Sequence, residues 1–299
     1  MQDFRMQTFL TVCRTMNYTR AAEELNITQP AVSKHIRYLE EAYGVRLFSQ
    51  QGKRLSLTPQ GAMLKDAAVT IAHDGTALRL RMAGAARRLR LGCTLTAGEY
   101  VAALPVARYL RSRANASLKL TVADTGLLLG ELERGEIDCA LVEGFFAKHQ
   151  YDSIVCRREP FVAVCAPGFP LPGGPCTLSR LRDRHLLLRE PGSGTRAVLE
   201  HALAVHNLSL EDFPHRSEIS SINIIKILAG QGCGVAFLYQ AAVEAELESG
   251  LLRAVPLAPG ELIPHDFTFL WRRGSIFAEE YRRLFEELFP NAEAQTCPR

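Results

Sequence analysis

The chain has 299 residues, 47% of them hydrophobic, which is enough for two or three domains with buried cores. No run of about 18 apolar residues is present and the N-terminus lacks the apolar core of a signal peptide, so we expect a cytoplasmic protein without a membrane span. The net charge of +3 is unevenly distributed: residues 1–90 carry 14 Lys or Arg and 7 Asp or Glu, whereas residues 91–299 carry 21 and 25. A basic N-terminal part suits a phosphate-bearing partner.

The first predicted elements are two short helices joined by a tight turn, within residues 18–44. Thr28 and Pro30 are typical of the start of the second helix, and Gly44 is typical of its end. Helical spacing predicts the buried face of this helix, formed by Val32, Ile36 and Leu39. Such a hairpin can place its second helix in the major groove of DNA. The alternative is an ordinary helical hairpin with a solvated polar face.

This region resembles the N-terminal domain of LysR-type transcriptional regulators, in which the pattern AAEEL-N-[IL]-[ST]-Q-P-AVS recurs. The resemblance continues through VRLF (45–48) and RLSLTPQG (54–61) and implies a winged helix-turn-helix domain that binds promoter DNA. The chain departs from the family in the wing, where Ser49, Gln50 and Gln51 stand in place of the usual arginines, so we expect weaker or shifted backbone contacts there. The candidate DNA contacts are Thr19, Arg20, Thr28, Gln29, Pro30, Ala31, Ser33, Lys34, His35, Arg37, Lys53 and Arg54.

A long helix is predicted next, because Thr58 can cap it, Pro59 suits its first position and no breaker follows until Gly75 and Gly84. Apolar and small residues repeat in it at spacings of 4 and 3, a heptad seam formed by Leu64, Ala68, Ile71, Gly75, Leu78, Met82 and Ala85. The alternative is an amphipathic helix lying on its own domain. In the family this linker helix pairs two chains, so we expect a homodimer through Leu64, Ala68, Ile71, Leu78 and Met82. A second pairing through the C-terminal domains would give a homotetramer.

From Arg88 onward the pattern becomes alternating strands and helices. Strands are predicted at 88–93, 117–124 and 137–144, separated by helices at 98–114 and 125–136. This order predicts a parallel sheet with crossover helices. A second series follows, with strands at 162–171, 185–190, 215–220, 235–239, 251–257 and 267–273, and helices at 195–206, 221–229, 241–249 and 275–289. Two α/β lobes in series suggest a protein that closes around a small molecule.

Three segments, LRLGCTLTAGEY, GEIDCALVEG and REPGSGTR, resemble the effector-binding domain of LysR-type regulators, which implies a two-lobed fold like that of type 2 periplasmic binding proteins. The expected fold class is therefore α/β with an all-α N-terminal head. We expect a winged helix-turn-helix domain at 1–58, a linker and dimerisation helix at 59–87 and an effector-binding domain at 88–299. Within the effector-binding domain, lobe I is expected at 88–161 and 267–299, and lobe II at 162–266.

The candidate effector site lies in loops at the carboxyl ends of the strands, where open α/β sheets bind ligands. The glycine-rich turn at 190–196 leads into a helix N-terminus, where free N–H groups favour an anion. The candidate residues are Thr94, Leu95, Thr96, Gly98, Glu99, Thr125, Gly126, Glu143, Ser193, Gly194, Thr195, Arg196 and Asn223. Two simpler interpretations remain open: Arg196 paired with Glu190, and the glycines forming only a tight turn. REPGSGTR is typical of the sulfur-assimilation branch of the family, which suggests an inorganic sulfur anion or a sulfur metabolite as effector.

Other classes of protein are less well supported. The sequence has no phosphate-binding P-loop, no nucleophile elbow and no Cys/His zinc spacing, so we expect no catalytic residues, cofactor or metal. A thiol-based redox regulator using Cys93 or Cys233 remains an alternative, as does a small-molecule-binding protein or enzyme that does not act on DNA. The expected partners are promoter DNA, a small anionic effector, RNA polymerase and further copies of the chain.

Overall fold

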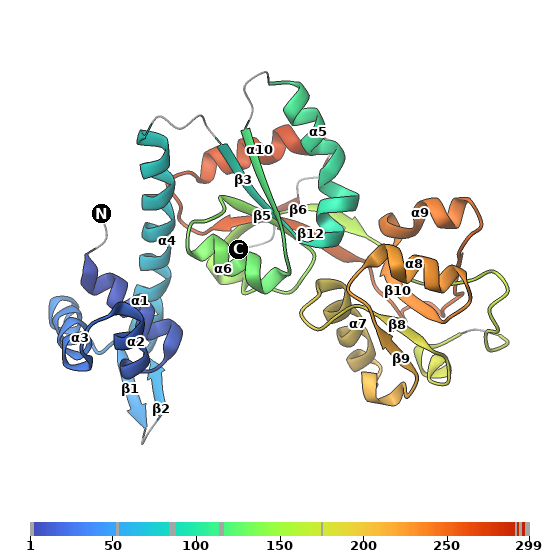
Figure 1. Cartoon of the computed structure of the whole chain (residues 1–299), viewed down its shortest axis with the longest axis horizontal. Helices are drawn as coiled ribbons and strands as arrows, with labels where there is room; N and C mark the ends of the chain where they lie inside the picture. The colour runs from blue at the N-terminus through green and yellow to red at the C-terminus, as the bar shows by residue number, and fades with distance from the viewer. Residues whose placement is uncertain are drawn as a thin grey trace.

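The structure is a computed structural model that describes residues 3–51, 54–83, 88–113, 117–174, 176–290, 292 and 295–296. A small head at the N-terminus is followed by a long helix, α4, and then by two α/β lobes that lie side by side (Figure 1). This arrangement confirms the predicted fold class. Within the described residues, no helix is both long and apolar enough to cross a membrane.

The head contains three helices and a two-stranded antiparallel sheet: α1 (Phe4–Thr15), α2 (Tyr18–Leu25), α3 (Gln29–Tyr43), β1 (Phe48–Gln51) and β2 (Arg54–Leu57). Local signals set the helix ends. The Thr28 side chain caps α3 by accepting a hydrogen bond from the Ala31 amide at 3.3 Å, and Gly44 ends the helix with a φ of 66°. The predicted buried face is confirmed, since Val32, Ile36 and Leu39 pack in the core of the head.

The long helix α4 spans Pro59–Met82 and begins as predicted, with the Thr58 hydroxyl accepting from the Gly61 amide at 3.0 Å. Its first turns pack against the head, where the described contacts are with α1 and β2. Its later turns pack against α6 of lobe I. One helix therefore joins the head to lobe I through direct contacts at both of its ends.

The start of α4 offers a test of this packing. A Cβ at Gly61 would lie 2.1 Å from the carbonyl oxygen of Leu47, so Gly61→Ala must push α4 off the head. We expect a loss of about 2–4 kcal/mol in the free energy of unfolding, measured by urea denaturation of the full chain. The control is Gly168→Ala, at an exposed turn of lobe II where a Cβ meets nothing within 4 Å. This change should alter the free energy of unfolding by no more than about 0.5 kcal/mol. Equal effects of the two substitutions would contradict the packing described.

Lobe I is built on a six-stranded sheet in the order β13-β6-β12-β5-β3-β4. Its strands β3, β4 and β5 are parallel, as predicted, whereas β12 pairs antiparallel with both β5 and β6. The elements are β3 (Arg88–Cys93), a π-helical turn η1 (Ala97–Ala102), α5 (Ala103–Arg111), β4 (Ser117–Val122), α6 (Thr125–Glu133), β5 (Cys139–Val142), η2 (Lys148–Gln150), β6 (Tyr151–Glu159), β12 (His265–Arg272), α10 (Ala278–Leu288) and β13 (Gln295–Thr296).

Lobe II is built on a five-stranded sheet in the order β11-β7-β10-β8-β9. The elements are β7 (Phe161–Cys165), η3 (Leu178–Leu181), β8 (Leu186–Leu188), α7 (Gly194–Val205), η4 (Leu210–Asp212), β9 (Arg216–Glu218), α8 (Ile222–Gly230), β10 (Val235–Tyr239), α9 (Gln240–Glu248) and β11 (Arg253–Ala254). The chain crosses between the lobes twice, once between β6 and β7 and once between β11 and β12.

Several details differ from the sequence prediction. The predicted helix at 98–114 is a π-helical turn followed by α5, and the strands predicted at 162–171 and 251–257 are shorter. The nine-residue strand β6 was not predicted, and it lies between β12 and the edge strand β13 of the lobe I sheet. The last helix begins at Ala278, with Phe277 and not the predicted Ser275 at its N-cap; the Ser275 hydroxyl donates to Asp74 of α4 at 2.6 Å and accepts from the Phe277 amide at 3.2 Å.

Candidate DNA-binding and effector sites

The second helix of the hairpin, α3, presents a polar face to solvent. Gln29, Lys34 and Arg37 are exposed on it, and Ser33 is half-buried. The Gln29 side chain donates to the Ser33 hydroxyl at 3.0 Å, which fixes two of these groups relative to each other. Lys34 and Arg37 have no ion pair with any residue that the structure describes, so both cations are available to phosphates or base edges.

His35 is a correction to the predicted DNA contacts. Its Nδ1 lies 3.0 Å from the hydroxyl of Thr8, and its ring packs edge-on against Phe4 at 5.7 Å, so it holds α3 against α1. Tyr38 was not among the predicted DNA contacts. It is exposed on α3, and the Arg5 guanidinium lies 3.7 Å from its ring centroid. Its position directly after Arg37 in the sequence could have marked it as a candidate contact.

The remaining predicted DNA contacts lie in three places. Thr19 and Arg20 are exposed at the start of α2, and Pro30 and Ala31 lie with Thr28 at the start of α3. In the wing, the Ser49 and Ser56 hydroxyls lie 2.7 Å apart across β1 and β2, and Arg54 is exposed. Lys53 lies outside the described residues.

The predicted seam of α4 needs correction at its first two positions. Leu64 is half-buried against the core of the head, and Ala68 is only 1% exposed, so Ala68 is not available to contact another chain. Five exposed apolar side chains of α4 lie on one face, because they are spaced by four or seven residues: Met63, Ala67, Ile71, Leu78 and Met82. Ala85 of the predicted seam lies outside the described residues.

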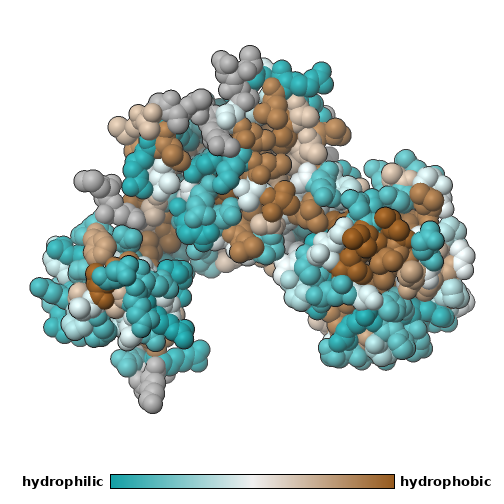
Figure 2. Space-filling model, viewed as in Figure 1, coloured by the Kyte–Doolittle hydropathy of each residue, from teal (hydrophilic) through white to brown (hydrophobic). Residues whose placement is uncertain are grey.

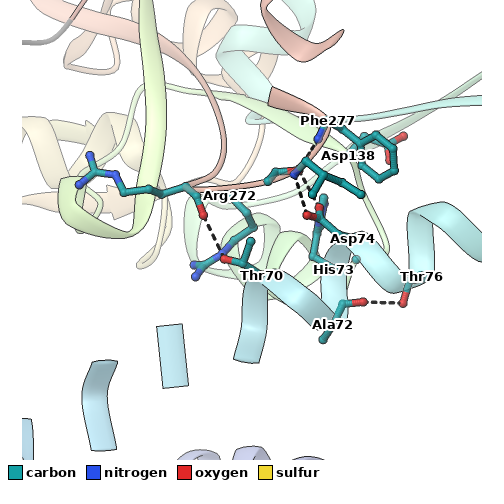
Figure 3. Close-up of polar contacts among 12 residues, drawn as sticks. Thr70, Ala72, His73, Asp74, Thr76, Asp138, Arg272 and Phe277 are labelled. Carbon is teal, nitrogen blue, oxygen red and sulfur yellow. Dashed lines mark hydrogen bonds and ion pairs between the residues drawn. The ribbon is translucent and has the colours of Figure 1, made fainter. Parts of the chain in front are cut away.

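The opposite side of α4 is bonded to lobe I of the same chain (Figure 3). His73 is fully buried, and its ring nitrogens lie 3.0 Å from Asp74 Oδ1 and 3.2 Å from the carbonyl oxygen of Ile137. Asp74 accepts hydrogen bonds from the Ser275 hydroxyl and from the Ile276 amide, at 2.6 and 2.9 Å. Burial would raise the pKa of Asp74, but the hydrogen bonds from His73 and its other partners lower that pKa below its usual value.

Between the lobes, the predicted effector residues form a buried polar cluster. Thr94 and Glu143, which follow β3 and β5, are each 2% exposed, and the Thr94 hydroxyl donates to the Glu143 carboxylate. Thr96 of lobe I and Thr195 of lobe II are also buried, with their hydroxyl oxygens 3.3 Å apart. These contacts bring the carboxyl edge of the lobe I sheet against the start of α7 in lobe II.

The Glu143 side chain lies beside the N-terminus of α7. A Cβ at Gly194, the first residue of α7, would lie 3.2 Å from Cδ, Cγ and Oε1 of Glu143, so a larger residue there would require the Glu143 side chain to shift. Burial raises the pKa of Glu143 to about 7, although its hydrogen bonds and the charge of Arg189 lower it. The carboxyl group is therefore poised between its neutral and charged forms near neutral pH.

Arg196 is a further correction, since it does not point its charge at this cluster. Its guanidinium forms ion pairs at 2.8 Å with both Glu200 and Glu218. The alternative partner, Glu190, is paired instead with Arg189 at 2.7 Å. Arg189, which was not among the predicted site residues, is 6% exposed and directly precedes the glycine-rich turn.

The other predicted effector residues vary in burial. Ser193 is buried at the start of α7, and Thr125 is buried with no hydrogen-bond partner for its hydroxyl among the described residues. Leu95 packs against the core of lobe II, and Asn223 accepts from Tyr100 of lobe I at 3.5 Å, so the lobes touch along the cleft. Gly98 is buried, whereas Glu99 and Gly126 are exposed.

The cysteines give little support to a redox sensor. Cys93 is fully buried, and burial raises the pKa of its thiol to about 12, which disfavours the reactive thiolate. Cys233 is exposed, and the described cysteines are all free thiols. Among the described residues, no group of three His, Cys, Asp or Glu side chains is placed to hold a metal ion.

Comparisons with known proteins agree with this two-part organisation. Residues 4–62 match the family model of the bacterial regulatory helix-turn-helix protein, lysR family, and residues 83–291 match that of the LysR substrate binding domain. The HTH-type transcriptional regulator CbbR of Rhodospirillum rubrum is 32% identical over 305 residues, covering 98% of this chain and 97% of that protein. The HTH-type transcriptional regulator YeiE of Escherichia coli (strain K12) is 28% identical and covers 90% of this chain and 89% of its own length.

Solved structures share the fold. Full-length BenM has a TM-score of 0.59 with 19% identity and complete coverage of both chains. A full-length OxyR variant from Pseudomonas aeruginosa has a TM-score of 0.60 with 21% identity, covering 100% of this chain and 99% of that chain. The two family models and the CbbR relative show that the protein is a DNA-binding transcriptional regulator with an effector-binding domain. The chain belongs to the LysR family of transcriptional regulators.

Proposed function

We propose that this regulator responds to a small anion bound between its two lobes. The observation that carries the proposal is the start of α7, where Thr195 and the lobe I residues Thr94, Thr96 and Glu143 form a buried polar cluster beside the first turn of the helix. Unpaired N–H groups and the helix dipole favour negative charge at this position. The REPGSGTR segment supports an oxyanion of sulfur or a sulfur metabolite as the effector.

Glu143 gives this site a dependence on pH. When its carboxyl group is neutral, it can donate a hydrogen bond to a bound oxyanion. When it is charged, it repels the anion and itself satisfies the α7 N-terminus. Because burial raises its pKa to about 7, anion affinity should be high below pH 7 and should fall as the pH rises through that value.

Calorimetric titration with sulfate and thiosulfate tests the site, since neither anion titrates between pH 6 and 8. The affinity of the full chain should fall by about tenfold from pH 6 to pH 8, because the neutral fraction of Glu143 falls by that factor. Glu143→Gln should remove this dependence, and Glu244→Gln, an exposed carboxyl on α9, should leave it unchanged. Absence of anion binding at pH 6, or an identical pH profile for Glu143→Gln, would disprove the proposal.

Effector binding would act on DNA through the oligomer. We propose that two chains pair through the exposed apolar face of α4, and that the effector changes the angle between effector domains and so the spacing of the two heads on a dyad-symmetric site. Coupling of this kind is typically ~1–3 kcal/mol. The regulator would act in the cytoplasm on promoter DNA, with RNA polymerase as a further partner. Footprints and DNA bends that stay unchanged at saturating effector would contradict this coupling.

A second pairing surface is available for a tetramer. Figure 2 shows apolar surface over α5 and β4 of lobe I and again over α8 of lobe II. The exposed side chains in these regions are Leu104, Leu110, Leu120, Val122, Ile224 and Ile227. Two patches on opposite lobes suit an antiparallel arrangement in which lobe I of one chain contacts lobe II of its partner.

A further inference from the structure

Lobe I contains a cavity at the opposite end of its parallel strands from the proposed effector site. It has a volume of about 470 Å³ and lies where the end of α4 meets α5, α10 and the edge of the sheet. Leu89 and Arg90 near the start of β3, Lys119 near the start of β4, and Asp138 just before β5 contribute to its wall.

The cavity and the cleft lie at opposite ends of the same parallel strands. Thr94 and Glu143 follow the carboxyl ends of β3 and β5, whereas the cavity is lined from the amino ends of β3, β4 and β5. A ligand in the cavity would therefore touch α4, which carries the head, without entering the cleft between the lobes.

The interior of the cavity is largely apolar. Ala77 and Leu80 of α4, Leu89 of β3 and Leu284 of α10 line it together with the rings of two tyrosines. One of these, Tyr281, is 2% exposed, and its hydroxyl is buried with no hydrogen-bond partner among the described residues. A buried hydroxyl without a partner is costly, and an oxygen of a bound ligand would supply the missing acceptor.

The charges that line the cavity are predominantly positive. Each of its three carboxylates has an arginine partner: Arg90 pairs with Asp138, Arg81 with Glu280 at 2.6 Å, and Arg113 with Glu287 at 2.8 Å. Two further cations, Lys119 and Arg283, have no ion pair within 4.0 Å among the described residues. The cavity therefore has an apolar interior and an excess of two positive charges.

We propose that this cavity is a second small-molecule site, for an amphipathic anion whose apolar body packs against the leucines and tyrosines and whose charged group is held by Lys119 and Arg283. Because α4, α5 and α10 all contribute to the wall, a bound ligand joins the linker helix to lobe I more firmly. The site is independent of the effector proposed for the cleft.

The chain carries its own reporter for this site. Its single tryptophan, Trp271, is buried on β12 with its ring centroid 6.3 Å from that of Tyr281. Two fluorescent probes differ by one sulfonate: 8-anilinonaphthalene-1-sulfonate is an anion, and N-phenyl-1-naphthylamine is neutral. Excitation of Trp271 in the full chain should give sensitised emission from both probes, with tighter binding of the anion.

Charge reversal separates the proposed site from nonspecific dye binding. Lys119→Glu with Arg283→Glu should weaken binding of the anionic probe by about tenfold or more and leave the neutral probe nearly unchanged, which also shows that the variant is folded. Arg108→Glu, on the exposed side of α5 and outside the cavity, should affect neither probe. Three results would each overturn the proposal: no Trp271-sensitised emission, equal affinity for the two probes in the unaltered chain, or equal weakening by Arg108→Glu.

Discussion

Replacing Lys34 and Arg37 by glutamate is expected to lower the affinity for promoter DNA by about 100-fold or more, because each lost base or phosphate contact costs ~1–3 kcal/mol. Both side chains extend from the exposed face of α3 and have no ion pair with the residues that the structure describes. The same change should also flatten the dependence of affinity on salt, since fewer counterions are released on binding. Gel-shift or anisotropy titrations with the DNA upstream of the gene, at several salt concentrations, measure both effects.

A change in net charge alone would also weaken DNA binding, so a matched control is needed. Arg180→Glu with Arg182→Glu alters the net charge equally, but both positions lie exposed at η3 in lobe II, outside α3 and outside the apolar patches proposed for pairing. We expect this control to bind DNA nearly as well as the unaltered chain. If the two variants lost affinity to the same extent, α3 would not be the recognition helix.

Glutamate at Ile71 and Leu78 is expected to give monomers and to lower operator affinity by about 100-fold or more, because a single head loses the high effective concentration that a tethered second head provides. These side chains are 63% and 43% exposed in the chain alone, so their substitution disturbs little inside the monomer. Light scattering gives the mass of the particle, and a titration with operator DNA gives the affinity.

The control for this experiment lies on the same helix. Ala62 is exposed on α4 but lies off the apolar face, and Ala62→Glu should leave both the mass and the affinity unchanged. A double variant at Ile71 and Leu78 that remained dimeric would show that α4 is not the pairing surface.

The head was predictable from the sequence because its signals are local. The caps at Thr28 and Gly44 and the three-residue stripe of α3 each depend on neighbours within one helix. Strand β6 was not predictable from the sequence. Its pairing partner, β12, lies more than 100 residues further along the chain, and the burial of residues along β6 does not alternate regularly. A short stretch with mixed burial carries no clear period.

The burial and orientation of the site residues depend on contacts between segments far apart in the sequence, which local sequence patterns do not predict. Apolar residues of α4 face the head, lobe I and solvent in turn, so periodicity could not decide that Ala67 is exposed and Ala68 buried. The His35 ring is oriented by its hydrogen bond with Thr8 of α1, and the Arg196 side chain is oriented by its ion pair with Glu218 of β9. The role of Glu143 follows from its approach to Gly194, which is 51 residues away and in the other lobe.

The junction between α4 and lobe I also bears on how the protein should be divided for experiments. The ring nitrogens of His73 in α4 lie beside Asp74 and the carbonyl oxygen of Ile137, so the helix and lobe I share buried polar contacts. An effector domain cut after α4 would expose the Ile137 carbonyl and leave the Ser275 hydroxyl and the Ile276 amide without their carboxylate. A fragment that begins at Pro59 keeps these groups paired. A hybrid regulator that carries the DNA-binding head of another protein should likewise be joined before α4, so that α4 and lobe I come from the same protein.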